Sequence, residues 1–470
     1  MPKKTLYRNI MDHYITQIES GQLLPGERLA PEREIAKNFS VNRSTVVRAL
    51  EELQSLGWIT RKQGSGTRVN DGQLANRRSP LSWLQHTHYA RKKPEDPYLT
   101  KVHEQKTTPD VLDLFSGDLP EQLIPDFSFP EMSWETILKQ AQQTTTAGYT
   151  PLLNALVQHL QKRMTIPITS SELLITSGAT QGLSVILQTL LAPGACVATE
   201  DPSFLFALPF FATLDLQLKG LPQDQYGILP DALETLCQQQ KIDLLYVNPT
   251  HQNPTGRTLS LNRRKKIVDI CKTYDIPIVE DDVFSELSFT APPKRLIELA
   301  PEQVIYLGSL SKLFSPLIHI GWIIAPKRLI TSFLKTKETT ELTTDIFPQL
   351  FATVALKDPS YTEKQHYLIQ QLHIRSKRFE TFLDTLKDWH YQPINGGIYY
   401  WLTYTKRRLT RKDWQLFLDQ NILLAPAFLF SRDTIACRIN YTRLDEHDFS
   451  VFQERFLFID AQLRKDDCNE

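Results

Sequence analysis

Residues 303–312, which read QVIYLGSLSK, contain the pattern that decides the fold. The run QVIYL at 303–307 is apolar, the small residues Gly308 and Ser309 follow it, and Lys312 comes three residues later. A short apolar run bounded by turn residues is typical of a strand buried on both faces. We therefore expect a buried strand with a lysine just beyond its carboxyl end, although most lone lysines are solvated surface charges.

Similar short runs occur on the amino-terminal side of this segment and alternate with helical patterns. They cover residues 173–176, 196–199, 244–247 and 276–279, and a helix is expected to start near Thr180. This alternation predicts an α/β doubly wound, mainly parallel sheet, in which ligands bind at the carboxyl ends of the strands.

Residues 1–70 have a different pattern, that of three helices and a hairpin. Apolar residues recur at helical spacing from Ile10 to Ile18, and Pro31 suits the first turn of a second helix that runs to about residue 39. Asn42 can cap a third helix. Strand-like residues at 58–60 and 67–69 then flank a Gly-Ser-Gly turn, which predicts a β-hairpin.

Residues 71–112 have no sustained periodicity. A structureless stretch of that length is uncommon within one domain, and 470 residues exceed one ordinary core. We therefore expect a domain at 1–70, a linker at 71–112 and a second domain at 113–470.

Composition and charge narrow the classes of protein. The chain has no net charge, but residues 1–70 hold eleven Lys/Arg against seven Asp/Glu, which suits a small nucleic-acid-binding unit. It starts without a secretory signal and has no apolar run long enough to span a bilayer. Its five cysteines are scattered and form no C-x-x-C pair, so we expect a cytoplasmic protein without disulfides, a metal site or a membrane partner.

The third helix of the first domain offers a DNA-reading surface. Arg43, Ser44, Thr45 and Arg48 lie near its amino-terminal end, from which a recognition helix contacts base edges in the major groove. Arg33 on the preceding helix could reach a flanking phosphate. The alternative for each residue is a solvated side chain on an ordinary small helical bundle.

The hairpin tip offers a second DNA contact. Gly64, Ser65, Gly66 and Thr67 suit a wing that lies on the DNA backbone or in the minor groove, because glycine permits close approach.

The first domain closely resembles the GntR family of winged-helix regulators. Four segments carry the resemblance, and they read GERL at 26–29, EREIA at 32–36, VNRSTV at 41–46 and GSGT at 64–67. The resemblance implies a winged helix-turn-helix domain that binds double-stranded DNA.

The second domain offers the groups that pyridoxal phosphate requires, starting with a Schiff-base lysine and an acid for its pyridine nitrogen. Lys312 is the candidate lysine. Asp281 follows the strand expected at 276–279 and can face the cleft, whereas the alternative is that the acidic triplet 280–282 caps a following helix.

Donors for the cofactor phosphate come from the turn before the helix near residue 180. Ser177, Gly178, Ala179 and Thr180 lie between a strand and a helix, where backbone N–H groups and the helix dipole hold phosphate. The signal is weak by itself, since many strand–helix turns contain glycine and threonine.

Three further residues complete the candidate site. Phe204 could stack on the cofactor ring, or simply belong to the core. The Asn253 amide could donate to the phenolic oxygen. Arg438 is a charge inside an apolar run, and burying it is costly without an anion, so we expect a substrate or effector carboxylate or, alternatively, a structural salt bridge.

Together these motifs resemble the fold-type-I aminotransferases from about Asp113 to the carboxyl terminus. A GntR-type head on such a body resembles the MocR/GabR group of regulators. The resemblance implies a mainly parallel sheet with a smaller carboxyl-terminal α+β lobe, and a head-to-tail homodimer in which Tyr149 reaches the partner's phosphate site. It also implies Lys312 as the Schiff-base lysine, Asp281 at the pyridine nitrogen, Ser309 in the cofactor site and Arg438 as the carboxylate anchor.

The second domain departs from the family pattern at two places in the cofactor site. His319 stands where the family has an arginine that binds the phosphate, and histidine offers fewer donors and less charge. The tyrosine expected after the acidic pair is replaced by Val283 or Phe284. We therefore expect weaker cofactor binding than in a working aminotransferase, with an empty site as the limit.

Three hypotheses follow. The first is a regulator whose DNA binding responds to an amino-acid-like effector that displaces Lys312. The second is an aminotransferase with a regulatory head and residual transamination, and the third is a cofactor-free dimerisation domain.

Overall fold

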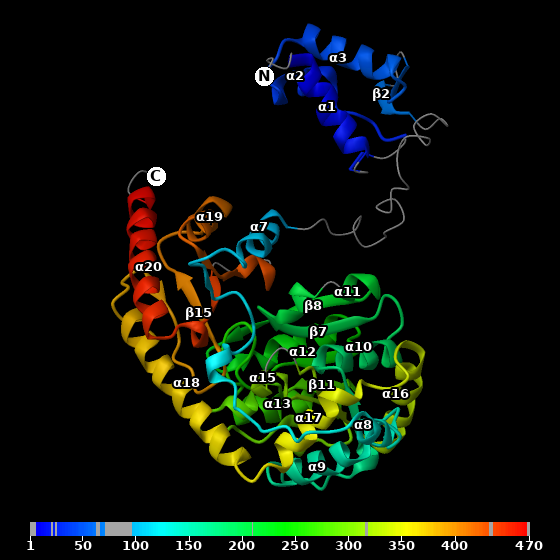
Figure 1. Cartoon of the computed structure of the whole chain (residues 1–470), viewed down its shortest axis with the longest axis vertical. Coiled ribbons are helices and arrows are strands. Elements are labelled where there is room, and N and C mark those ends of the chain that lie inside the picture. Colours follow the sequence, from blue (N-terminus) through cyan, green and yellow to red (C-terminus); the bar gives the residue numbers. More distant parts are fainter. Residues whose placement is uncertain are drawn as a thin grey trace. The chain divides into compact units, whose positions relative to one another are not determined.

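The structure is a computed structural model of the whole chain (Figure 1). It describes residues 6–19, 22–23, 26–62, 66–70, 96–208, 210–314, 318–431 and 436–467. The chain divides into two compact units, Met1–Pro97 and Tyr98–Glu470. Of the residues expected at the hairpin tip, Gly64 and Ser65 lie outside the described residues.

The first unit contains the expected three helices and a hairpin. These elements are α1 (Leu6–Glu19), α2 (Glu32–Asn38), α3 (Arg43–Ser55), β1 (Ile59–Lys62) and β2 (Gly66–Val69), with the two strands antiparallel. Its core is a single cluster in which Ile10, Ile35 and Leu50 are fully buried. Asn42 is the N-cap of α3 as predicted, but its side chain makes no capping hydrogen bond.

An eight-stranded sheet forms the centre of the second unit. Its strand order is β6-β13-β12-β11-β10-β7-β8-β9. The strands are β6 (Leu173–Thr176), β7 (Cys196–Asp201), β8 (Gln217–Asp224), β9 (Gly227–Ile228), β10 (Leu244–Val247), β11 (Ile278–Asp281), β12 (Val304–Ser309) and β13 (Gly321–Ile324). Pairing is parallel from β12 through β11, β10 and β7 to β8, whereas β13 runs antiparallel to both β12 and β6. The prediction of a mainly parallel sheet is confirmed.

Helices cover both faces of this sheet because its strands are apolar on both faces. Alternate residues of each strand enter two different clusters, so that Leu245 belongs to one and Leu244 to the other. The helices α9 (Thr150–Gln161), α12 (Pro230–Gln239), α13 (Leu261–Thr273) and α17 (Ile346–Lys357) contribute to the first cluster, and α10 (Ala179–Leu190) and α16 (Lys327–Thr340) to the second.

A smaller antiparallel sheet forms the carboxyl-terminal lobe. It has the order β14-β15-β18-β17, with β14 (Trp389–His390), β15 (Tyr399–Tyr404), β17 (Ala425–Pro426) and β18 (Ala436–Asn440). The helices α18 (Tyr361–Leu383), α19 (Arg411–Asp419) and α20 (Glu446–Asp467) accompany it. This α+β lobe agrees with the expected architecture.

The second unit begins inside the segment expected to be a linker. Helix α7 (Pro97–Gln105) and strand β3 (Leu112–Asp113) precede the sheet. Tyr98 and Val102 of α7 are buried in the core of the carboxyl-terminal lobe. The sequence did not predict this helix, because Tyr98 and Val102 alone give no sustained periodicity.

Shorter elements connect these layers. They are η1 (Glu121–Leu123), α8 (Trp134–Ala141), β4 (Thr144–Thr145), β5 (Gly148–Tyr149), η2 (Ser170–Glu172), η3 (Phe204–Ala207), α11 (Phe210–Thr213), η4 (Ser285–Leu287), α14 (Leu296–Leu299), α15 (Ser311–Phe314), β16 (Ile422–Leu423), η5 (Ala427–Leu429) and η6 (Tyr441–Arg443). Within the described ranges, no helix combines the length and apolar character that crossing a membrane requires.

Candidate functional site

Asp281 is the last residue of β11, two residues beyond the strand end that the sequence predicted. Its Oδ2 accepts a 2.5 Å hydrogen bond from the Tyr246 hydroxyl on the neighbouring strand β10. Its Oδ1 is buried and has no hydrogen-bond partner in the described residues. Burial raises the pKa of Asp281 to about 6, while hydrogen bonding from the Tyr246 hydroxyl and the Val283 backbone, together with the charge of Lys312, lowers it. Asp281 is therefore a buried acceptor whose Oδ1 lacks a well-formed hydrogen bond, and it lies within electrostatic reach of Lys312.

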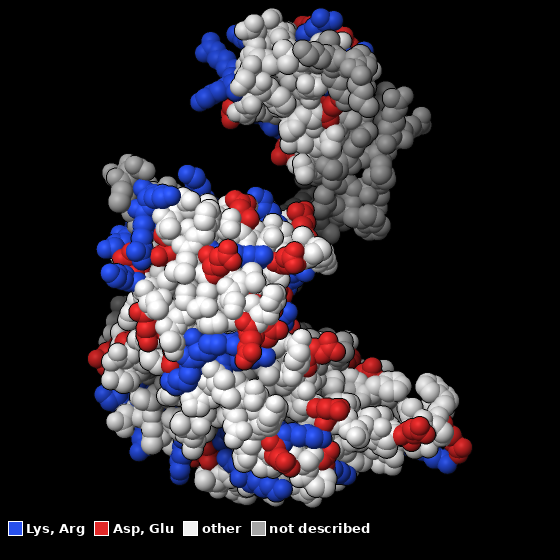
Figure 2. Space-filling model, turned by 60° about the vertical axis from the view of Figure 1, so that its left-hand side comes forward, with Lys and Arg blue, Asp and Glu red and all other residues white. Residues whose placement is uncertain are grey.

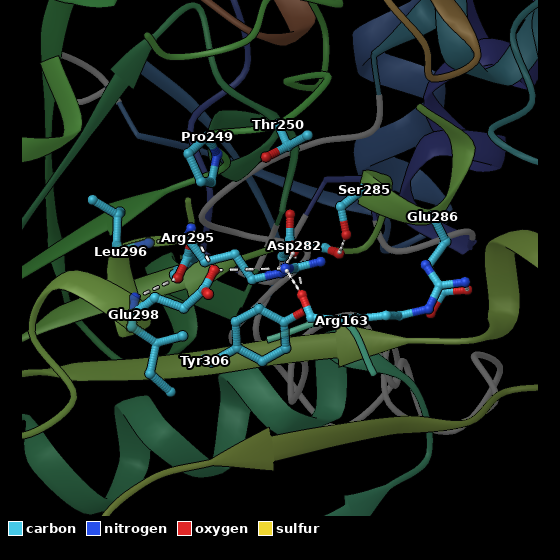
Figure 3. Close-up of polar contacts among 12 residues, drawn as sticks. Arg163, Pro249, Thr250, Asp282, Ser285, Glu286, Arg295, Leu296, Glu298 and Tyr306 are labelled. Carbon is cyan, nitrogen blue, oxygen red and sulfur yellow. Dashed lines mark hydrogen bonds and ion pairs between the residues drawn. The ribbon is translucent and has the colours of Figure 1, made fainter. Parts of the chain in front are cut away.

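The two acidic neighbours of Asp281 face the opposite side of the sheet, because side chains alternate along a strand. Asp282 Oδ2 accepts from Arg295 Nε at 2.8 Å and from the Tyr306 hydroxyl at 3.0 Å (Figure 3). Glu280 accepts from the first backbone N–H groups of α14, Leu296 and Ile297, both at 2.9 Å. The helix-capping alternative is thus right for Glu280 and wrong for Asp281, and the ion-pair network anchors the end of β11.

Lys312 lies on the short helix α15, directly after β12. The Ser309 hydroxyl shapes the preceding turn, since it donates to Ile320 O at 2.9 Å and accepts from Ser311 N at 3.1 Å. Lys312 Nζ donates to Gly117 O at 2.7 Å, and the Asp118 carboxylate is 3.7 Å away. The sequence interpretation missed Gly117 and Asp118, because they precede the first strand of the large sheet by more than fifty residues.

The turn expected to hold the cofactor phosphate lies between β6 and α10, as predicted. Gly178 is the N-cap of α10 with φ 85°, a conformation that favours glycine. A Cβ on Gly321 would lie 2.6 Å from Gly178 C, so strand β13 packs closely against this turn. His319 is exposed beside it, with its Cβ 4.0 Å from where a Gly178 Cβ would be. Ser177, Gly178, Ala179, Thr180 and His319 are thus brought together at a helix N-terminus.

A carboxylate that the sequence interpretation missed also contacts this turn. Glu341 accepts a 3.1 Å hydrogen bond from the Ser177 hydroxyl and a short one from Gln181 Nε2. One helical turn earlier, the fully buried Lys337 donates to Ile175 O and Thr146 O, both at 3.0 Å. Burial lowers the pKa of Lys337 to about 8. The end of α16 therefore holds the turn in place and adds a negative charge beside it.

Arg438 is buried on β18, at 5% exposure, and its guanidinium lies among acceptors and aromatic rings. Nη1 donates to Asn253 Oδ1 at 2.9 Å and Nη2 to Phe115 O at 2.6 Å. Its centre is 4.3 Å from the Tyr399 ring centroid and 4.9 Å from that of Phe430. Burial lowers the pKa of Arg438 from its ordinary value.

The bonding of Arg438 is incomplete. Its Nε–H is buried without a partner in the described residues, and no carboxylate forms a salt bridge with it there. This observation disfavours the structural salt bridge that the sequence left open.

Of the other residues predicted for the site, Phe204 lies near Arg438. Phe204 N donates to Asn253 O at 3.1 Å, and Asn253 bonds Arg438. Tyr149 does not take part in these contacts, because it is buried within its own unit and its hydroxyl contacts Gln140 of α8. Phe284 is buried, and its ring centroid is 5.9 Å from Lys312 Nζ. An apolar ring thus lies where a tyrosine hydroxyl was expected.

The candidate DNA-reading residues separate into two groups. Ser44 and Arg48 are one helical turn apart on α3 and exposed, and the Arg48 guanidinium lies 4.3 Å from the Tyr7 ring centroid. Arg43 instead bonds Glu32 of α2 at 2.9 Å. The structure therefore does not bring Arg43 and Arg48 together. Side chains five residues apart on a helix with 3.6 residues per turn point to different faces.

Other exposed groups extend this surface. Arg33 on α2 is exposed, Thr45 is half-buried, and Gly66 and Thr67 begin β2. Arg61 of β1 pairs with Glu32, so Glu32 links α3 to the hairpin. Basic side chains project from the edge of this unit in Figure 2.

Two family models match the chain. Residues 6–69 match the bacterial regulatory proteins of the gntR family, and residues 109–456 match aminotransferase class I and II.

Relatives match over most of their length. An uncharacterized HTH-type transcriptional regulator of Bacillus subtilis, YdfD, is 30% identical over 454 residues, covering 94% of this chain and 93% of YdfD. The HTH-type transcriptional regulator NorG of Staphylococcus aureus is 24% identical, covering 88% of this chain and 95% of NorG. Among solved structures, a multiple substrate aminotransferase from Thermococcus profundus superposes with a TM-score of 0.71 at 26% identity, covering 81% of this chain and 98% of that enzyme.

Proposed function

Since this chain belongs to the MocR/GabR-type regulators, which join a GntR DNA-binding head to an aminotransferase class I and II body, we propose that its body binds pyridoxal phosphate through Lys312 and senses an amino-group small molecule. The DNA-binding regulator is the family assignment. The cofactor, the effector and the residues that hold them are the proposal.

One buried atom carries the cofactor proposal. Asp281 Oδ1 has no partner among the described residues, and the carboxylate is within electrostatic reach of Lys312. Leaving such an acceptor unpaired costs about 1–3 kcal/mol, so its presence supports a ligand that donates a hydrogen bond there. The protonated pyridine nitrogen of the cofactor is such a donor, and bound pyridoxal phosphate supplies an electron sink.

The chain's residues then have defined tasks. Asp281 holds the proton at the pyridine nitrogen, and Tyr246 orients the carboxylate. The backbone N–H groups at the start of α10, with the Thr180 side chain, face the phosphate, and His319 contributes charge when protonated. Asn253 and Phe204 border the ring.

Arg438 supports an effector with a carboxylate. Its unpartnered Nε–H and its two Nη groups offer the fork that carboxylates bind. With pyridoxal phosphate held by Lys312, the effector amine would take the place of Lys312 on the cofactor, and Lys312 Nζ would take up the two protons that the effector amine gives up. The released Lys312 amine can then donate to Gly117 O.

Regulation requires that the effector bind two arrangements of the protein with different affinity.

We propose that DNA is read by Ser44, Thr45 and Arg48, with Arg33 and the hairpin on the phosphate backbone, and that Arg43 positions α2 through Glu32.

Fluorescence anisotropy of operator DNA, with and without effector, tests whether Arg438 holds the effector carboxylate. Arg438→Ala should remove the effector response and leave effector-free DNA affinity unchanged. An unchanged response would contradict it.

We propose a head-to-tail homodimer through an apolar patch on the second unit. Trp134 and Leu138 on α8 are 66% and 49% exposed, and Phe347 on α17 is 49% exposed. Tyr149 links the patch, since its backbone N bonds Gln349 of α17 and its hydroxyl contacts α8. Exposed apolar patches of this kind support association. Trp134→Glu should shift the sedimentation coefficient to that of a monomer, and a persistent dimer would contradict the patch.

The enzyme hypothesis remains a second candidate because Lys312, Asp281 and Arg438 are all present. Steady conversion of an amino acid with a keto-acid acceptor would favour it. The cofactor-free body is favoured by the exposed His319 and by Phe284. Wild-type DNA binding and dimerisation in Lys312→Ala, together with no uptake of pyridoxal phosphate, would favour that third hypothesis.

A further inference from the structure

Asp118 is a carboxylate at the reacting end of the candidate site that neither the cofactor nor the expected effector carboxylate requires. Its Oδ1 is 3.7 Å from Lys312 Nζ, beyond hydrogen-bond distance, and its side chain is 35% exposed. An acid this close to Nζ lies beside the position that an incoming amine must reach. Within the described part of the chain, the Asp118 carboxylate has the Lys312 ion pair and no hydrogen bond, so it faces the position that an effector amine would take.

The backbone around Asp118 is held firmly, so its carboxylate has a defined place. Asn440 Nδ2 donates to Ser116 O at 2.8 Å and to Asp118 O at 2.9 Å. The backbone at Gly117 passes close to Tyr399, since a Cβ there would be 2.6 Å from the Tyr399 hydroxyl. Asn440 itself is fully buried on β18, two residues from Arg438. One strand thus positions both Arg438 and the acid.

The walls of the site also favour positive charge. The rings of Tyr399 and Phe430 lie over Arg438, and the ring of Phe284 lies near Lys312 Nζ. Aromatic faces attract cations, and Phe284 presents a ring without the hydroxyl group of the expected tyrosine. Asp118 is also close enough to Arg438 to interact electrostatically with it. A second carboxylate on the effector would meet this negative charge.

We propose that Asp118 selects effectors that carry a second positive charge besides the reacting amine, such as basic amino acids, and rejects dicarboxylic ones. This inference rests on the proposed roles of Lys312 and Arg438 and names the chemical class of ligand for that site. Arg438 holds the effector carboxylate, Lys312 exchanges with its amine, and Asp118 pairs with the side-chain cation. A charge-assisted contact of this kind is worth about tenfold in affinity.

Matched amino acids test the selection on the full-length protein loaded with pyridoxal phosphate. L-arginine and L-citrulline differ mainly in the charge of the terminal group, as do L-lysine and L-norleucine, and L-2-aminoadipate adds an acid. The change of the visible absorption band gives the half-saturating concentration of each. We expect each basic member to act at a concentration about tenfold lower than its neutral partner, and the acidic probe to act most weakly.

Variants separate selection from a structural role. Asp118→Asn should bring the basic-to-neutral ratio to about one, while Asp118→Glu keeps the preference. Asp126→Asn, an exposed acid on the same segment, serves as the control and should leave the ratio unchanged.

Two results would overturn the inference. A ratio near one in the wild type, with a band that responds to amines, would remove the selection, and so would an equal weakening of all probes in Asp118→Asn. If the wild type develops no band with pyridoxal phosphate, the proposed function itself fails and the inference falls with it.

Discussion

The ring end and the phosphate end of the candidate cofactor site are built differently. At the ring end, Asp281 is buried, oriented by Tyr246 and backed by the ion pairs of Glu280 and Asp282. At the phosphate end, His319 is exposed and Glu341 places a carboxylate on Ser177. The ring end offers the groups that pyridoxal phosphate requires, whereas the phosphate end has a histidine where an arginine was expected and a carboxylate beside the turn.

The two ends therefore differ in how completely they supply the contacts that would hold pyridoxal phosphate. Groups at the ring end decide what happens to an amine at Lys312, and groups at the phosphate end contribute most of the anion binding. A sensor needs the first and can operate with a weakened second, because it need only respond to its ligand and not turn it over. Substitutions at the two ends should therefore move cofactor affinity in opposite directions.

The largest effect is expected at the ring end. Asp281→Asn removes the negative acceptor and should weaken pyridoxal phosphate binding about 100-fold, the value of a buried charge-assisted hydrogen bond of about 3 kcal/mol. Equilibrium titration of the visible band measures it, with Asp269→Asn on the surface of α13 as control. A loss below about threefold would show that the ring end does not hold the cofactor.

We also expect the affinity for pyridoxal phosphate to depend on pH through Asp281. The pKa of Asp281 is about 6 because the group is buried, so it takes up a proton as the pH falls through that value. Since only the ionised form pairs with a protonated pyridine, cofactor affinity should fall about tenfold between pH 7 and pH 5. Asp281→Asn should lose this dependence. Equal slopes in both proteins would assign the titration to another group.

At the phosphate end, substitution is expected to strengthen cofactor binding. His319→Arg restores a permanent charge and a bidentate fork, which should strengthen cofactor binding about tenfold at pH 8. His366→Arg, on α18, controls for added charge. An unchanged dissociation constant would mean that position 319 does not reach the phosphate.

The smallest effect is expected for Glu341→Gln. The amide keeps a hydrogen-bond acceptor for Ser177 while removing the negative charge, so binding should strengthen about threefold. Isothermal titration with pyridoxal phosphate measures the change, and Glu338→Gln, one turn earlier on α16, is the matched control. Weaker binding in Glu341→Gln would assign Glu341 a purely structural role.

The sequence predicted most of the scaffold because periodicity and turn residues are local signals. The winged-helix head, the strands around Lys312 and the α10 turn could be read this way. Strand ends shifted by one or two residues, as at Asp281, because register depends on neighbouring strands. Tyr246, Asp118 and Glu341 could not be found, since their importance comes from contacts between segments far apart in the chain. Helix α7 was missed because its few buried residues carry no long pattern.

The central claim is that Lys312 carries pyridoxal phosphate in a regulator. The visible absorption spectrum of the purified protein with added pyridoxal phosphate tests it most directly, alongside Lys312→Ala and, as a control, Lys335→Ala on the surface of α16. We predict the visible band of a lysine-bound pyridoxal group in the wild type and in Lys335→Ala but not in Lys312→Ala. No band in any of the three, or an equal band in all, would contradict the account.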